Sequence, residues 1–139
     1  GHAEGGDKVD FKNLKLTWKP NQVLVAPTGY CRNATPHLES KVYEVSVETL
    51  HDAFRAMVKR QPRTSVIEER SDGARFVQRS RLMRFPDFVD VQFLSMAARQ
   101  STLLLYSRSK YGVRDFGVNE ARVRTWLAEL DAELAGRAD

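Results

Sequence analysis

The chain has 139 residues, of which 42% are apolar and 29% are charged, and this is the size and composition of one globular domain. Its longest apolar runs, such as residues 103–106, are far shorter than the roughly 18 residues of a membrane-spanning helix, so we expect no membrane span. Cys31 is the only cysteine, which excludes an intramolecular disulfide.

The net charge of +4 is unevenly distributed along the chain. Residues 75–124 carry ten basic and four acidic side chains, and nine of the ten basic residues are arginine. The planar guanidinium of arginine suits carboxylates and phosphates better than the point charge of lysine does. This part of the chain therefore has a chemical preference for anions.

The first 17 residues are polar and rich in lysine and aspartate, so we expect residues 1–17 to form a flexible N-terminal arm. Residues 18–135 are expected to form a single α+β domain. The chain begins Gly1-His2-Ala3, which is typical of a cleaved tag or of a cut downstream of a leader, so we expect that a leader or anchor has been removed. Three prolines and Gly29 favour extended, irregular structure over residues 18–36.

Residues 43–47 alternate between apolar and polar side chains, which predicts a half-buried strand. A helix follows, because apolar residues recur from Leu50 to Val58 at spacings of three and four and share one face. Pro62 ends this helix. Ser46 is a candidate N-cap, so the boundary between strand and helix is open by a residue or two.

Four strands are expected after this helix. The pair Asp72-Gly73 is a tight-turn signal between the first two, which predicts a hairpin. Alternating side chains indicate that the third strand has one buried face, and a run of leucines indicates that the fourth is covered on both faces. The predicted strands comprise residues 64–70, 74–83, 89–93 and 101–111.

Asn119 is a candidate N-cap for a long final helix, whose apolar stripe runs from Val123 through Trp126 to Leu134, with Arg122 pointing away from it. The predicted fold is α+β: a strand, a helix, a four-stranded antiparallel meander, and a C-terminal helix packed on the sheet. Helix-grip and TATA-binding-protein-like folds have this architecture.

Three blocks of the sequence carry a family resemblance. They are PNQVLVAP at 20–27 with Gly29 and Cys31, FVQRS at 76–80 with RFPD at 84–87, and YSRSKYG at 106–112 with DFGVN at 115–119 and RV at 122–123. Together they resemble the bacterial domain-of-unknown-function family 1499, over about residues 18–130. The resemblance implies no catalytic residue and no cofactor. Because its members often look like cell-envelope proteins, it implies a periplasmic or cell-envelope location.

Arg79 and Arg81 lie two residues apart, so they share one face of a strand, and Arg75 begins the same row. We expect Arg79 and Arg108 to converge on one anion-binding spot, because strands far apart in sequence can meet in a curled sheet. Arg108 lies among hydroxyl-bearing residues, which are Tyr106, Ser107, Ser109 and Tyr111.

The alternative is that these arginines lie in solvent or form ion pairs with the acidic residues of the region. Those acidic residues are Asp87, Asp90, Asp115 and Glu120. Nucleic acid is a poor expectation, because the chain has no RNP-type motif, zinc finger or clear recognition helix.

Gln78 and Ser80 lie between Phe76 and Leu82 on one face of the second predicted strand of the meander. If that face is buried, the two polar groups need partners, and a ligand is one of the possible partners. The opposite face, marked by Val77, is an equal candidate for the core side.

The sequence offers no catalytic constellation and no metal site. Its three histidines do not stand at catalytic or metal-ligand spacing, and it has no phosphate loop or dinucleotide fingerprint. We therefore expect a protein that is not an enzyme and has no cofactor, with a hydrolase as a distant alternative.

The first functional hypothesis is a cell-envelope domain that binds a small amphipathic or anionic ligand between its sheet and its final helix. The second is an interaction module that docks an acidic partner protein through residues 111–119 and the arginines. The candidate ligand-binding residues are Gln78, Arg79, Ser80, Arg81, Tyr106, Ser107, Arg108, Ser109, Tyr111, Asp115 and Asn119.

Overall fold

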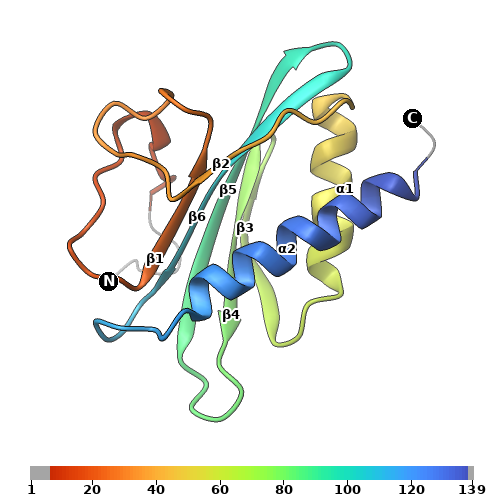
Figure 1. Ribbon diagram of the computed structural model, residues 1–139. Coiled ribbons are helices and arrows are strands. Elements are labelled where there is room, and N and C mark those ends of the chain that lie inside the picture. Colours follow the sequence, from red (N-terminus) through yellow and green to blue (C-terminus); the bar gives the residue numbers. More distant parts are fainter. Residues whose placement is uncertain (1–6, 138–139) are drawn as a thin grey trace.

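The computed structural model describes residues 7–137, in which two helices cover one face of a six-stranded sheet (Figure 1). The order of the strands is β2-β1-β6-β5-β4-β3, and only β1 and β2 pair in parallel. The elements are η1 (Phe11–Asn13), β1 (Gln22–Ala26), β2 (Leu38–Glu39), α1 (Val47–Lys59), β3 (Thr64–Arg70), β4 (Gly73–Arg79), β5 (Pro86–Ala97), β6 (Gln100–Ser109) and α2 (Val118–Ala135).

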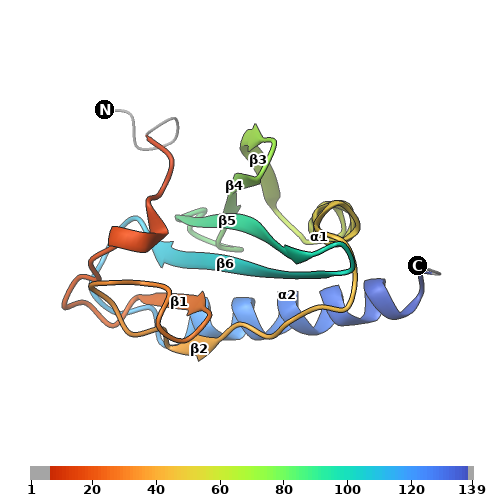
Figure 2. The ribbon, with the colours of Figure 1, turned by 90° about the horizontal axis from the view of Figure 1, so that it is seen from above.

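The α+β class and the C-terminal helix are confirmed, whereas the sheet is a mixed one of six strands rather than the expected antiparallel sheet of four. Strands β3 to β6 pair in antiparallel fashion in chain order, and β1 and β2 extend the sheet beyond β6. Figure 2 shows that the sheet twists, so that β3 and β4 are turned steeply relative to β5 and β6. Among the described residues, neither helix is long and apolar enough to cross a membrane.

Strand β1 corrects the expectation of irregular structure at residues 18–36. All five of its residues are buried, because it lies between β2 and β6 and is covered on both faces. Val23 and Val25 face the helices, whereas Leu24 and Ala26 face the other side. A strand buried on both faces has no alternation of apolar and polar residues, and this is why its sequence does not distinguish it.

The strand predicted at residues 43–47 is wrong. Tyr43 makes one isolated bridge to Ser101, and α1 already begins at Val47. Ser46 caps this helix, because its side chain accepts a hydrogen bond of 3.1 Å from the amide of Thr49. The side chains of Tyr43 and Val45 pack against the core from a segment without regular pairing, which accounts for the alternation.

The hairpin of β3 and β4 is confirmed, but β4 ends at Arg79 and not at residue 83. The chain turns between Ser80 and Phe85, where the Phe85 amide donates to the Ser80 hydroxyl at 2.9 Å. Strand β5 is longer than expected at both ends, and β6 is close to its expected bounds. The shorter β4 leaves residues 80–85 as a loop at the end of the sheet.

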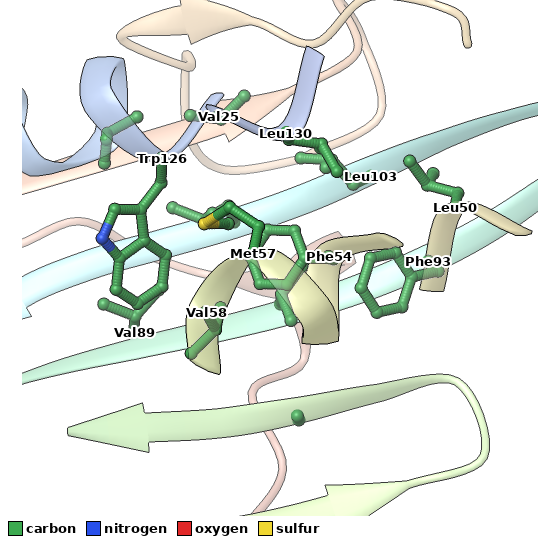
Figure 3. Packing of buried hydrophobic residues seen from close by; sticks show 14 of the residues in the cluster. Val25, Leu50, Phe54, Met57, Val58, Val89, Phe93, Leu103, Trp126 and Leu130 are labelled. Atoms are coloured by element: carbon green, nitrogen blue, oxygen red, sulfur yellow. The ribbon is translucent and has the colours of Figure 1, made fainter. Parts of the chain in front are cut away.

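The main core lies between the sheet and the two helices. Trp126 of α2 is 1% exposed, and its ring centre lies 6.0 Å from those of Phe54 on α1 and Phe76 on β4. Figure 3 shows Trp126 together with Phe54, Met57 and Val89 at this junction. The expected docking of the final helix on the sheet is present, with α1 packed beside it.

A smaller cluster covers the other face of β1 and β6. Phe11 of η1 is buried there against Leu24, Cys31 and Leu104. Residues 1–6 of the expected flexible arm lie outside the described residues, whereas residues 7–17 include this packed segment (Figure 1). The packing of Phe11 differs from the loose attachment that the polar composition indicates, because one aromatic side chain anchors the segment.

Candidate functional site

A buried network of polar side chains joins the start of α2 to the sheet, and Arg122 is at its centre. The Nη2 of Arg122 donates to Asp87 Oδ2 on β5 at 2.7 Å, and its Nε donates to Gln78 Oε1 on β4. Its Nη1 donates to Asn119 Oδ1 at 2.8 Å. Only 7% of the Arg122 side chain is exposed, so the expectation that it points away from the buried side of the helix is wrong.

Asn119 is the second centre of this network and is 1% exposed. Its Oδ1 accepts a hydrogen bond of 2.6 Å from Ser107, and its Nδ2 donates to Asp115 at 2.7 Å and to Ser109 at 3.0 Å. The same Nδ2 also donates to the backbone oxygen of Asn21 at 3.2 Å. Asn119 thus connects the first turn of α2 with β6 and with the residue that precedes β1.

Asp115, and not Asn119, caps the final helix. Its two carboxylate oxygens accept hydrogen bonds from the amides of Gly117 at 2.9 Å and Asn119 at 3.1 Å. Gly117 occupies the N-cap position with φ of 83°, a left-handed conformation that favours glycine, and brings both amides within reach of this carboxylate. The predicted N-cap role of Asn119 is therefore wrong, because its side chain is used inside the network.

The network joins α2 to the sheet through side chains that hydrogen-bond to one another. The hydroxyl of Ser107 is completely buried, and it donates to an amide oxygen and not to an imidazole or a carboxylate. It also accepts a hydrogen bond of 3.2 Å from Arg122. A buried polar network whose members are satisfied fixes one arrangement of the elements that it joins. Within residues 7–137, no group of three or more His, Cys, Asp or Glu side chains is arranged to hold a metal ion.

A second charged cluster lies on the opposite face of the sheet. Asp90 on β5 is 2% exposed and accepts hydrogen bonds from Arg75 at 2.9 Å and from Arg108 at 2.5 Å. The guanidinium of Arg108 lies 4.8 Å from the ring centre of Tyr106. The Tyr106 hydroxyl donates to Gln22 at 2.6 Å, and burial raises the pKa of this phenol.

The structure does not bring Arg79 and Arg108 together on one free spot. The Arg108 guanidinium is held by Asp90, whereas Arg79 Nη1 donates to the backbone oxygen of Arg84 at 3.1 Å. The candidate residues divide between the two faces, because neighbours on a strand point in opposite directions. Gln78, Ser107, Ser109, Asp115 and Asn119 belong to the helix side, and Tyr106 and Arg108 to the other.

Two adjoining pockets lie where the loop 80–85 meets the start of α2. We name the larger one, of about 510 Å³, the arginine compartment. The smaller one, of about 310 Å³, is the aromatic compartment. The arginine compartment is lined by Arg63, Arg79, Arg81 and Arg122, and the aromatic compartment by Phe85, Tyr111, Phe116 and Arg114.

The two compartments share Ser80 and Val118 in their linings, so they are immediate neighbours, and we call them together the depression. The polar network forms part of the boundary of both, through Gln78 and Arg122 in the first and Asp87, Ser109 and Asp115 in the second. A third hollow of about 430 Å³ lies beside β1. Its Arg124 already pairs with Glu120 at 2.9 Å, so it offers no comparable cation.

The sequence pattern of the family DUF1499, described as a protein of unknown function, matches residues 15–130. The chain belongs to the DUF1499 family. This match covers most of the chain and includes all three blocks that carry the resemblance. No curated protein matches the chain.

In this DUF1499 domain the longest block, residues 106–123, builds the polar network. It supplies Ser107, Asn119 and Arg122 as partners on the helix side, and Arg108 as the partner of Asp90 on the other face. The most distinctive sequence feature of the chain therefore supplies many of the polar contacts between α2 and the sheet.

Several residues of the depression in the DUF1499 domain are not singled out by any pattern in the sequence. Phe85 and Phe116 were not among the predicted site residues, although both are exposed and line the aromatic compartment with Tyr111. Arg63 was not considered, because it stands alone between Pro62 and a strand. The one signal for Phe85 and Phe116 is their position in loops rich in arginine, where no strand or helix pattern accounts for a phenylalanine.

Proposed function

We propose that this DUF1499 domain binds a small amphipathic anion and is not an enzyme. The anionic head occupies the arginine compartment, and the apolar part occupies the aromatic compartment. The observation that carries the proposal is that these two unlike compartments adjoin each other at Ser80 and Val118. A ligand with both an anionic head and an apolar part would occupy the whole depression.

The charges of the arginine compartment support an anionic head. Arg122 is neutralised by Asp87, and Glu129 accepts a hydrogen bond from Gln61. Arg63 and Arg81 are exposed, and neither has a carboxylate within ion-pair distance among residues 7–137. Arg63 Nε donates to the backbone oxygen of Arg79 at 2.9 Å, so the Nη groups of Arg63 and the guanidinium of Arg81 supply the charge-assisted hydrogen bonds to a phosphate or carboxylate.

The aromatic compartment supports an apolar tail. Phe85 and Tyr111 meet edge to face with ring centres 6.3 Å apart, and Phe116 and Val118 complete the apolar lining. Its volume of about 310 Å³ is at the small end of ligand pockets, which favours a short chain or a single ring.

The test is calorimetric titration with octyl phosphate, octanoate, octanol and inorganic phosphate. Octyl phosphate is expected to bind saturably and more tightly than octanol or inorganic phosphate, because it fills both compartments and each of those two probes fills only one. Arg63→Gln and Arg81→Gln should each lower the affinity for octyl phosphate by about tenfold, which corresponds to the loss of one charge-assisted hydrogen bond. Phe85→Ser should weaken octyl phosphate and leave inorganic phosphate unchanged.

Arg55→Gln is the matched control, because Arg55 lies on α1 and pairs with Glu69 away from the depression. No saturable binding of octyl phosphate by the parent protein would contradict the proposal. An equal loss of affinity for octyl phosphate in Arg55→Gln and in Arg81→Gln would also contradict the proposal. Native mass spectrometry of freshly purified protein adds an independent test, since a bound ligand would appear as an added mass.

We further propose that the domain works in the cell envelope, as the family resemblance implies. An amphipathic anion is a common component of that environment, and this supports the location. The test is fractionation of the native host with an antibody to the domain. Recovery in the cytoplasmic fraction alone would contradict this location without affecting the binding proposal.

A further inference from the structure

Two loops at one end of the sheet expose large apolar side chains. Leu82 and Met83 lie on the loop between β4 and β5 and are 86% and 67% exposed, and Phe116 on the loop between β6 and α2 is 93% exposed. Figure 1 shows both loops at the lower end of the molecule, where the first projects beyond the sheet and α2. The ring contact of Phe85 with Tyr111 joins the two loops. We call residues 80–85 and 110–117 together the tip.

The exposure of these residues requires an explanation. An isolated exposed leucine is ordinary on a protein surface, but several large apolar side chains gathered at one place mark a surface of interaction. Leu82 and Met83 line neither compartment of the proposed ligand site, so that site does not account for them.

The tip is also strongly basic. It carries Arg81, Arg84, Lys110 and Arg114 against a single carboxylate, that of Asp115. That carboxylate is used inside the molecule, where it accepts hydrogen bonds from the amides at the start of α2. A protein surface that binds anionic lipid typically presents apolar side chains surrounded by cationic ones, as the tip does.

We propose that the tip docks on the surface of an anionic phospholipid bilayer. Leu82, Met83 and Phe116 enter the boundary between the headgroups and the acyl chains, and Arg84 and Lys110 contact the lipid phosphates. The protruding shape favours lipid over a protein partner, because a bilayer deforms around projecting side chains, whereas a protein needs a matching hollow. Of these five residues only Phe116 also lines a compartment of the proposed ligand site, so the docking can be tested separately through Leu82, Met83, Arg84 and Lys110.

The test is co-sedimentation of the full chain with vesicles of phosphatidylcholine alone, and of phosphatidylcholine mixed with phosphatidylglycerol. We expect binding to the mixed vesicles that weakens at high salt, and little binding to the neutral ones. The double variant Leu82→Ser/Met83→Ser should bind the mixed vesicles at least about tenfold more weakly, because it removes most of the inserted apolar area. Arg84→Gln/Lys110→Gln should bind about 25-fold more weakly, at about fivefold for each cation.

The matched controls are Val66→Ser/Met96→Ser, which removes two exposed apolar side chains from β3 and from the far end of β5, and Lys59→Gln at the end of α1. Both should bind as the parent does. An unchanged unfolding midpoint for each variant shows that the fold is intact. Unchanged binding of octyl phosphate by Leu82→Ser/Met83→Ser separates docking from the ligand site.

Three results would overturn the docking. One is the absence of binding of the parent protein to the mixed vesicles at low salt. Another is equal loss in the tip variants and the controls. The third is binding that Arg84→Gln/Lys110→Gln abolishes and Leu82→Ser/Met83→Ser leaves intact. Such binding is electrostatic adsorption without insertion, which a basic surface that binds an acidic protein would also show.

Discussion

The guanidinium of Arg122 and the carboxylate of Asp87 lie 2.7 Å apart, although 35 residues separate them in the sequence. Both side chains are almost fully buried, so removal of one leaves the other as an uncompensated charge in the interior. We expect Arg122→Leu to lower the free energy of unfolding by about 3–5 kcal/mol, measured by urea denaturation.

The matched control for this pair is Arg124→Leu on the same helix, because Arg124 and Glu120 form an exposed ion pair. It should change the free energy of unfolding by less than about 1 kcal/mol. The double variant Arg122→Leu/Asp87→Leu should be more stable than the sum of the two single losses indicates, since it leaves no unpaired charge. Additive losses would show that the two residues act separately.

Trp126 is expected to be the largest single contributor from α2 to the core. It packs between Phe54 and Phe76 and is almost fully buried. Trp126→Ala should lower the free energy of unfolding by about 3–5 kcal/mol, through lost apolar contact and the cavity left behind. Thr125→Ala, the exposed neighbour, should change it little. A chemical-denaturation midpoint of Trp126→Ala equal to that of the parent would mean that the helix does not dock in this way.

Asp90 is expected to matter for stability and not for anion binding. Asp90→Asn leaves Arg75 and Arg108 without their carboxylate, so the free energy of unfolding should fall by about 3–5 kcal/mol. Arg108→Ala should likewise reduce stability and leave octyl phosphate binding unchanged. If Arg108→Ala instead weakens octyl phosphate as much as Arg81→Gln does, the original expectation of an anion site at Arg79 and Arg108 would be restored.

Cys31 is expected to report on the attachment of the N-terminal segment. Its thiol is buried beside Phe11, and burial raises its pKa, so the native protein should react slowly with a thiol reagent such as dithionitrobenzoate. Phe11→Ala removes the covering ring and should speed the reaction severalfold while most of the fold is retained. Lys12→Ala is the control. Equal labelling rates in the parent and in Phe11→Ala would mean that the segment does not cover the thiol.

Local patterns in the sequence predicted those elements that have one buried face or a strong turn signal. Helix α1 has its apolar stripe from Leu50 to Val58, and the pair Asp72-Gly73 stands at the turn between β3 and β4 as expected. Strand β1 has no such signal, because it is buried on both faces. The alternation at residues 43–47 was misleading, because side chains can alternate toward a core without the backbone forming a ladder.

The sequence by itself determined the α+β class, the family, and the concentration of arginine between residues 75 and 124, since each depends on local pattern or composition. Only the tertiary structure decided what each arginine does. Arg108 is paired with Asp90, Arg122 with Asp87, and Arg81 lines a depression that also holds exposed aromatic residues. The partners come from strands and loops far apart in the chain, and the pairing of those strands is set by the packing of the whole sheet, which no local pattern encodes.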